Sequence, residues 1–276
     1  MARFLMVLVL ANFLCTLWGC AHVPVTGRTQ LSLVPDSQLL AMSEKEYREF
    51  LKKHRLCSDR AQVEMVKRVG RRISQAVERF LAETGQSQRI AGYKWEFNLV
   101  CGKEINAFCM PGGKVVVYSG LLPVAKDENG LAVVLGHEIA HAVANHAAER
   151  LSQQLLLQLG GNALSMLTGS ANPATRNLLM QLYGLGANVG VLLPYSRTQE
   201  YEADHLGLIF MAMAGYDPRG AITFWERMMK AGKGHPKPPE FLSTHPSDSA
   251  RIQKIREYLP EALKYYRRYL QEHGKL

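Results

Sequence analysis

Residues 127–150 read DENGLAVVLGHEIAHAVANHAAER, and this stretch decides the fold. Asp127 stands at the N-cap position of a predicted helix. Apolar residues follow it at helical spacing, namely Leu131, Val134, Leu135 and Ile139. We therefore expect a helix that begins after Asp127 and continues past Arg150.

Inside this helix lies a His-Glu-x-x-His pattern, formed by His137, Glu138 and His141. Because four residues advance about 400° around a helix, the two imidazoles lie one turn apart on one face and can reach one zinc ion. Glu138 lies about 100° round from His137, near enough to contact a water at the zinc without binding the metal. The pattern predicts a zinc site with Glu138 as the catalytic general base.

A catalytic zinc needs a third protein ligand and one open position for water. The longest metalloprotease extension of the pattern requires glycine and histidine where this chain has Ala144 and Ala147, so that class is excluded. A second predicted helix supplies carboxylates instead: Glu200 and Asp204 share one of its faces, whereas Glu202 points elsewhere. We assign Glu200 as the third ligand and Asp204 as the acceptor for a ring N–H of a ligand histidine. A solvated acidic helix face is the alternative.

Two other histidines are candidates for the site. His146 follows His137 by nine positions, a rotation of about 900°, which places it on the opposite helix face and favours a surface or capping role. His245 lies in a loop just before the last predicted helix. A solvated loop histidine is the alternative to any function for it.

The rest of the chain predicts an α+β fold that is mainly α-helical. Amphipathic patterns predict helices over residues 36–53, 61–83, 198–213, 218–231 and 247–273. Short β-type runs at Ile105–Cys109 and Val115–Tyr118 flank Pro111-Gly112-Gly113, which predicts a small sheet with a hairpin beside the active-site helix. One hairpin strand, 114–118 or 106–109, would be an edge strand that binds substrate in extended form.

Two apolar stretches, residues 155–167 and 178–193, are separated by Gly169-Ser170-Ala171-Asn172-Pro173. Polar residues interrupt both stretches, and each is short for a membrane span of about 20 residues. They predict a helical hairpin packed on the domain, with a membrane-dipping hairpin as the alternative.

The N-terminus has the layout of a signal peptide over residues 1–19, with Arg3 followed by the apolar run Phe4–Leu17. Leu17-Trp18-Gly19-Cys20 resembles a bacterial lipobox, which predicts lipidation of Cys20. Residues 20–35 are then a linker, and residues 36–276 form the zinc metallopeptidase domain. An uncleaved N-terminal anchor is the alternative.

Charge and cysteine content restrict the partners and the compartment. The net charge is +9, and because no nucleic-acid motif accompanies it we expect an anionic membrane surface or no specific partner rather than nucleic acid. Outside the predicted signal and Cys20, three cysteines remain: Cys57, Cys101 and Cys109. Cys101 and Cys109 can bridge neighbouring strands, or they can be buried free thiols. The sequence does not determine the oligomeric state.

Several separated motifs together resemble metallopeptidase family forty-eight, which includes the heat-shock protease HtpX, the CaaX prenyl proteases and the periplasmic proteases BepA and LoiP. These motifs are HEIAHAVANHAAER from His137 to Arg150, Ser196-Arg197 ahead of Glu200 to Asp204, Asn106-Ala107-Phe108 before Pro111-Gly112-Gly113, and Thr244-His245-Pro246. The resemblance implies a gluzincin fold in which His137, His141 and Glu200 bind one zinc per chain and Glu138 is catalytic. It also implies that His245 approaches the metal in an inhibitory or regulatory role.

In layout the chain is most similar to the periplasmic lipoprotein members of that family. The resemblance implies a zinc-dependent metalloendopeptidase of the bacterial cell envelope that hydrolyses misfolded or unassembled envelope proteins. Lipid on Cys20 would anchor it, with an outer-membrane location facing the periplasm. The alternative function is a catalytically latent zinc-containing binding or assembly protein, in which His245 occupies the fourth zinc position.

Overall fold

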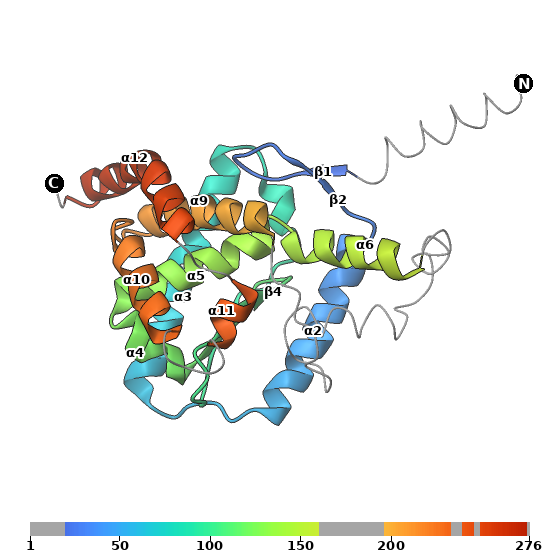
Figure 1. Ribbon diagram of the computed structural model, residues 1–276, viewed down its shortest axis with the longest axis horizontal. Helices are drawn as coiled ribbons and strands as arrows, with labels where there is room; N and C mark the ends of the chain where they lie inside the picture. Colours follow the sequence, from blue (N-terminus) through green and yellow to red (C-terminus); the bar gives the residue numbers. More distant parts are fainter. Residues whose placement is uncertain (1–19, 160–195, 233–238, 246–248, 275–276) are drawn as a thin grey trace, which may run out of the picture.

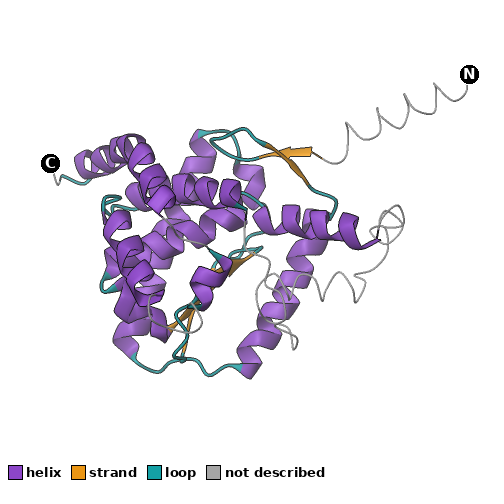
Figure 2. Cartoon of the chain, viewed as in Figure 1, coloured by secondary structure: helices purple, strands orange, loops and turns teal. Residues whose placement is uncertain are grey.

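The computed structural model describes residues 20–159, 196–232, 239–245 and 249–274. Helices pack around a small three-stranded sheet, which confirms the predicted mainly helical α+β fold (Figures 1 and 2). The longer helices are α2 (Asp36–Lys53), α3 (Arg60–Glu83), α5 (Glu128–Val143), α6 (His146–Leu159), α9 (Arg197–Met213), α10 (Gly220–Gly232) and α12 (Ser249–Glu272). The shorter ones are η1 (Ser87–Ile90), η2 (Ser119–Leu121), α4 (Leu122–Ala125) and α11 (Glu240–Thr244). Within these described residues, every helix is too short or too polar to cross a membrane.

The sheet contains β3 (Glu96–Val100), β4 (Ala107–Met110) and β5 (Lys114–Tyr118) in the order β3-β5-β4. The predicted hairpin is confirmed: β4 and β5 are antiparallel, and the turn between them contains two glycines with positive φ. In addition, β5 pairs in parallel with β3. Because β5 therefore has a partner on both sides, residues 114–118 cannot be an edge strand. The other predicted strand, β4, is at an edge of this sheet.

Helices α5 and α9 lie side by side through the middle of the molecule, and α12 packs against α9 (Figure 1). The α5 helix begins as predicted, because the Asp127 side chain accepts a hydrogen bond from the Gly130 N–H at 2.8 Å. A Cβ atom added at Gly136 would lie 2.8 Å from the carbonyl oxygen of Gly207. Glycine at both positions lets the two backbones touch, one residue before His137 in α5. This close approach brings the histidines of α5 to the acidic residues of α9.

The predicted continuation of the α5 helix past Arg150 is wrong. The helix ends at Val143, and Asn145 adopts a positive φ of 55° before α6 begins at His146. Asparagine is one of the few residues that tolerate this left-handed conformation, so it can break the helix at this point. Because the helix is interrupted here, helical rotation counted from His137 no longer applies after Val143.

The segment predicted as a linker is folded against the domain. Its strands β1 (Cys20–His22) and β2 (Thr29–Leu31) form an antiparallel pair. Between them, Arg28 forms ion pairs at 2.7 Å with Glu149 of α6 and at 2.9 Å with Glu202 of α9. The turn-forming residues that suggested a linker in fact form a short β-hairpin loop. The predicted signal peptide at 1–19 lies outside the described residues.

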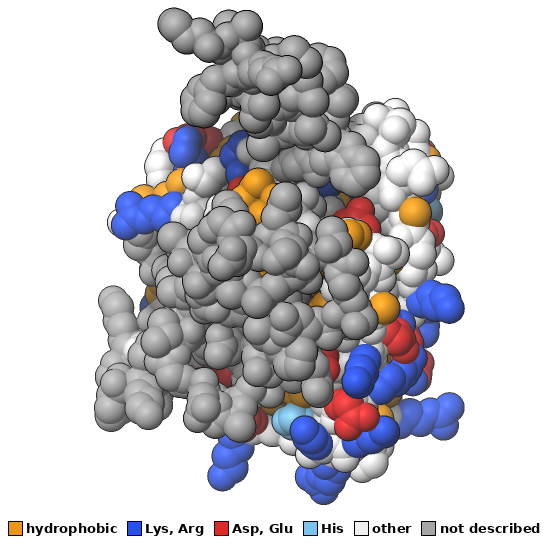
Figure 3. Space-filling view, turned by 90° about the vertical axis from the view of Figure 1, so that its right-hand side faces the viewer, with side chains coloured by type: hydrophobic (Ala, Val, Ile, Leu, Met, Phe, Trp, Pro, Cys, Tyr) orange, Lys and Arg blue, Asp and Glu red, His pale blue; other side chains and the backbone are white. Residues whose placement is uncertain are grey.

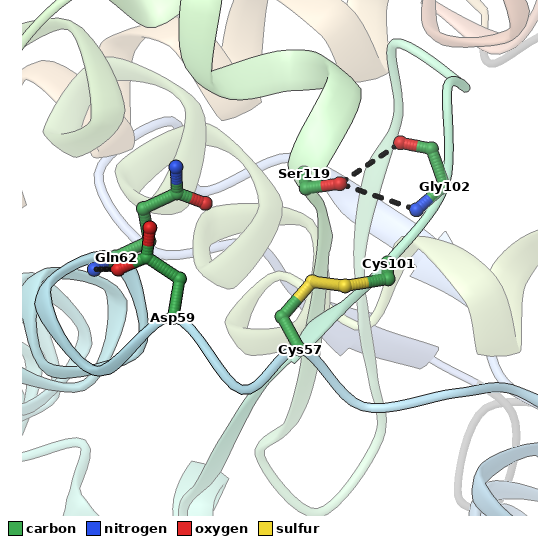
Figure 4. The surroundings of a disulfide bond; sticks show 6 residues. All are labelled: Cys57, Asp59, Gln62, Cys101, Gly102 and Ser119. Carbon is green, nitrogen blue, oxygen red and sulfur yellow. Dashed lines mark hydrogen bonds between the residues drawn. A yellow bond between two sulfur atoms is a disulfide. The ribbon is translucent and has the colours of Figure 1, made fainter.

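Cys101 pairs with Cys57 in a disulfide, and Cys109 is a buried free thiol (Figure 4). The suggested Cys101–Cys109 bridge is wrong because β5 lies between the strands that carry or precede these two residues. The segment before α3 instead runs beside the end of β3, where the Cys57 N–H donates to the Leu99 carbonyl at 2.9 Å. A disulfide of this kind is typical of proteins outside the reducing cytosol.

The other predicted helices match the structure closely, and α2 has the predicted bounds. The short helix α11 was missed, because the sequence suggested only a loop before His245. Of the predicted apolar hairpin, only residues 155–159 are described, as the end of α6, and the rest lies outside the described residues. On the face shown in Figure 3, Lys and Arg side chains lie among Asp and Glu side chains rather than forming a purely basic patch.

Candidate metal centre

The His-Glu-x-x-His residues lie in the last two turns of α5, in the interior of the protein. His137, Glu138 and His141 are each at most 3% exposed. The Nε2 atoms of the two histidines are 3.1 Å apart, as expected for side chains one helical turn apart on one face.

Two residues from other elements complete this cluster. Glu200, in the first turn of α9, places Oε1 3.4 Å from His141 Nε2 and Oε2 3.5 Å from His137 Nε2. His245, directly after α11, places Nδ1 3.2 Å from His137 Nε2 and 2.9 Å from Glu200 Oε1. One ligand atom from each of these four residues lies within 4.8 Å of all the others. The structure therefore brings His245 into the site, although the sequence left a solvated loop open.

The spacing and chemistry of these atoms fit a zinc ion. Ligand atoms about 2.0–2.2 Å from a tetrahedral zinc lie about 3.3–3.6 Å from one another. The separations among His137, His141 and Glu200 are 3.1–3.5 Å. Two imidazole nitrogens that face each other in a buried site repel unless a proton or a cation lies between them. Imidazole and carboxylate are also ligands that zinc commonly uses.

The His137 ring is oriented by Asp204, one turn along α9 from Glu200. Asp204 Oδ1 lies 3.0 Å from His137 Nδ1, the contact that the sequence predicted. Arg251 of α12 binds the same carboxylate through Nε and Nη2 at 2.7 and 2.8 Å, and its Nη1 is 2.8 Å from Glu200 Oε2. The guanidinium also lies over the Trp225 ring, 3.5 Å from its centroid. Arg251 is 1% exposed and was missed, because it is an ordinary basic residue in an amphipathic helix.

The His141 ring has a different neighbour. His146 Nδ1 is 2.9 Å from His141 Nδ1, and His146 Nε2 is 3.1 Å from Glu202 Oε2. The surface position predicted for His146 is wrong, because its side chain is fully buried. Glu202 lies off the face shared by Glu200 and Asp204, as the sequence predicted, and its carboxylate contacts His146 instead. The helix break at Asn145 turns His146 back toward His141. Asn145 directly before His146 was the sequence signal for this break, because asparagine tolerates a positive φ.

Burial keeps the imidazoles of His137 and His141 in the neutral form that can bind metal. It lowers the pKa of His137 to about 4 and the pKa of His141 well below its ordinary value. Burial alone would raise the pKa of Glu200, but His245 and Arg251 hold it well below the usual range, so this carboxylate is ionised. Burial raises the pKa of Glu138 to about 7. The site thus offers neutral nitrogens, one carboxylate ligand and a carboxylate of high proton affinity.

The sequence matches peptidase family M48 over residues 67–259, which is more than half of the chain. The chain belongs to this family. It is 44% identical over 190 residues to the mitochondrial metalloendopeptidase OMA1 of Schizosaccharomyces pombe, which covers 69% of this chain and 53% of that protein. It is 38% identical to OMA1 of Bos taurus over 87% of this chain and 46% of that protein. The beta-barrel assembly-enhancing protease of Escherichia coli is 32% identical over 59% of this chain and 34% of its own length.

The chain is thus a member of a peptidase family, and its buried cluster of His137, His141, Glu200 and His245 could hold a metal ion. The chain spans about half the length of the curated OMA1 relatives.

The predicted location as a lipid-anchored protein of the bacterial outer membrane is wrong, because relatives at 44% and 38% identity are named as mitochondrial. The lipobox resemblance at Cys20 covered only four residues. So short a pattern does not specify a compartment.

Proposed function

We propose that His137, His141 and Glu200 hold one zinc ion, that Glu138 is the catalytic base, and that Asp204 positions His137. The observation that carries this proposal is the close approach of these three side chains: the two Nε2 atoms lie 3.1 Å apart, and each lies 3.4–3.5 Å from an oxygen of Glu200. Zinc bound there supplies Lewis acidity, which acidifies water and polarises the carbonyl of the scissile peptide bond.

Glu138 has the properties of a residue that carries a proton in peptide hydrolysis. It follows a proposed ligand on α5, and within the described part of the chain its Oε1 accepts no hydrogen bond. With a pKa raised to about 7 by burial, its carboxylate can take a proton from water and return it to the leaving amine. These two transfers would let one side chain serve both halves of the reaction.

Substrate is proposed to bind in extended form along β4. This strand pairs with β5 on one side, packs against α5, and is the sheet edge next to the metal centre. Main-chain hydrogen bonds to an edge strand recognise the peptide backbone more than its side chains. Such recognition suits segments of misfolded or unassembled proteins, so we propose protein quality control as the biological role. The Cys57–Cys101 disulfide supports action in an oxidising compartment.

Cleavage of an unfolded protein by the purified chain tests this function. Reduced casein should be cut by the zinc-loaded chain, a strong chelator should stop cleavage, and added zinc should restore it. Glu138→Gln is the matched control, because it should still bind zinc. No cleavage by the zinc-loaded wild-type chain, or cleavage equal to wild type by Glu138→Gln, would contradict the proposed function.

A latent state is the second candidate, and the position of His245 favours it. Its Nδ1 belongs to the cluster with the three proposed ligands, and its Nε2 is 3.5 Å from Glu138 Oε1. A fourth protein ligand would exclude the water that Glu138 must activate. Because His245 directly follows the five-residue helix α11, a small movement there would reopen the position. The chain would then be a protease with low basal activity.

A further inference from the structure

The N-terminal segment reaches the metal centre through a continuous chain of hydrogen bonds. Arg28 binds Glu202 with Nε and Nη2, both at 2.9 Å, and the Thr26 hydroxyl donates to Glu202 at 2.8 Å. Glu202 in turn contacts His146, which contacts the proposed ligand His141. Two side chains, Glu202 and His146, therefore connect Arg28 to the ring of the proposed ligand His141.

The protons in this chain can be assigned from the charged end. A carboxylate held by a guanidinium and a hydroxyl accepts hydrogen bonds, so His146 Nε2 carries a hydrogen and donates it to Glu202. The neutral His146 ring then has a lone pair on Nδ1. Since that atom lies 2.9 Å from His141 Nδ1, the hydrogen between them belongs to His141. The remaining nitrogen of His141, Nε2, is left with a lone pair directed at the cluster.

Arg28 also holds two buried carboxylates together. Glu149 and Glu202 are 5% and 4% exposed, and Arg28 contacts both, with bonds of 2.7 and 2.8 Å to Glu149. Gln199 donates to Glu149 at 2.8 Å, so Arg28 fastens α6 to α9 beside the site. Buried carboxylates need such a counter-charge. Without Arg28, the acceptor that orients His146 would lose its position.

We propose that His146 is a positioning residue that fixes the tautomer and ring orientation of His141, and that Arg28 and Glu202 hold His146 in place. The N-terminal segment Thr26–Arg28 is thereby part of the metal centre. This inference rests on the proposed zinc site. The two histidine ligands then have separate supports. Asp204 supports His137, and a relay formed by His146, Glu202 and Arg28 supports His141.

Zinc affinity, measured by competition with a chelator of known affinity, tests the role of His146. His146→Leu removes the acceptor and should weaken zinc binding about 10–100-fold, the usual cost of losing an outer partner of a metal ligand. His146→Asn keeps an acceptor near the Nδ1 position and should recover most of the affinity. The visible absorption of the cobalt-substituted protein should change in His146→Leu, because it reports the ligand geometry. Thermal unfolding of each zinc-free variant measures any purely structural loss.

A double-mutant cycle tests the contribution of Arg28. Arg28→Met should weaken zinc binding several-fold in the wild-type background and have little effect in His146→Leu, because the two act in series. Arg48→Met is the matched control, since Arg48 pairs with Glu96 on the surface far from this relay. It should leave zinc affinity unchanged.

Three results would overturn the inference. The first is a zinc affinity of His146→Leu equal to that of the wild type. The second is an equal effect of Arg28→Met on zinc affinity in the wild-type and His146→Leu backgrounds. The third is a loss of zinc affinity in His146→Leu and His146→Asn that only parallels the loss of thermal stability of the zinc-free proteins. Failure of the zinc site itself is distinguishable: the wild-type chain would not bind one zinc, or His141→Ala would bind it as well as wild type.

Discussion

The two sides of the metal centre are built differently. On the His137 side, Asp204 accepts directly from the ring and is held by Arg251, which is 1% exposed and lies between helices. On the His141 side, a second histidine stands between the ring and the carboxylate, and the arginine, Arg28, has a side chain that is 28% exposed. One side is therefore part of the helical core, whereas the other depends on a short N-terminal hairpin at the surface.

This difference indicates which contacts serve stability and which serve the metal. A fully buried ion pair leaves uncompensated charge when one partner is removed, so its loss affects the whole fold. A partly exposed arginine can be replaced by water around the carboxylates, so its loss is more local. The His137 side should thus behave as a structural core, and the His141 side as an adjustable support for one ligand.

The largest effect is expected at Glu138. This residue belongs to neither the His137 side nor the His141 side, but its reaction depends on the zinc that both sides hold. Glu138→Gln should lower the rate of casein cleavage by about 10²–10⁴-fold, because the amide cannot accept the proton from water. Zinc content should stay at one per chain, since both supports and all three proposed ligands remain. Cleavage rate and zinc content are measured on the same preparation. Zinc loss in parallel with activity would assign Glu138 to metal binding.

Matched substitutions of Arg251 and Arg28 test the proposed difference between the two sides. Arg251→Met should lower the free energy of unfolding by about 3–5 kcal/mol, because Asp204 and Glu200 lose a buried counter-charge. Arg28→Met should lower it by less, because the 28% exposed side chain of Arg28 lets water reach Glu149 and Glu202. Urea unfolding of the zinc-free proteins measures both. Equal losses would mean that the N-terminal hairpin is as much a part of the core as α12.

Substitutions of Asp204 and Glu202 provide a finer test. They compare a carboxylate that contacts a ligand histidine directly with one that acts on a ligand histidine through His146. Asp204→Asn should weaken zinc binding about 10–100-fold, because Asp204 contacts a ligand ring directly. Glu202→Gln should have a smaller effect, since the amide oxygen can still accept from His146. The sequence alone placed Glu202 away from the face shared by Glu200 and Asp204. A larger loss in Glu202→Gln than in Asp204→Asn would reverse the proposed order of the two sides.

The smallest effect is expected at His245, which belongs to neither of the two supports. If His245 restrains the resting enzyme, His245→Ala should raise basal cleavage of casein several-fold and leave zinc content nearly unchanged. If it instead stabilises the tetrahedral intermediate, the same change should lower turnover by about a hundredfold or more. Initial rates and zinc content distinguish these roles. An unchanged rate with unchanged zinc would leave His245 without a function.

Much of the site was predictable from local periodicity. The positions of His137, Glu138 and His141 on one helix, and of Glu200 and Asp204 on one face of another, follow from spacing of one turn. Apart from the end of α5 and the missed helix α11, the bounds of the longer helices and the β4–β5 hairpin were predictable for the same reason, because both depend on residues close together in the chain.

Only the tertiary structure decided which distant residues meet around that site. Arg28 reaches Glu202 across 174 positions and Arg251 reaches His137 across 114, and neither contact leaves a periodic signal. His146 was misplaced because one residue with positive φ, Asn145, resets the helix direction that the calculation assumed to be continuous. Cys57 was likewise not recognised as the partner of Cys101, because β5 inserts between β3 and β4. Helical phase determines which side chains share a face, but packing between elements determines what those side chains touch.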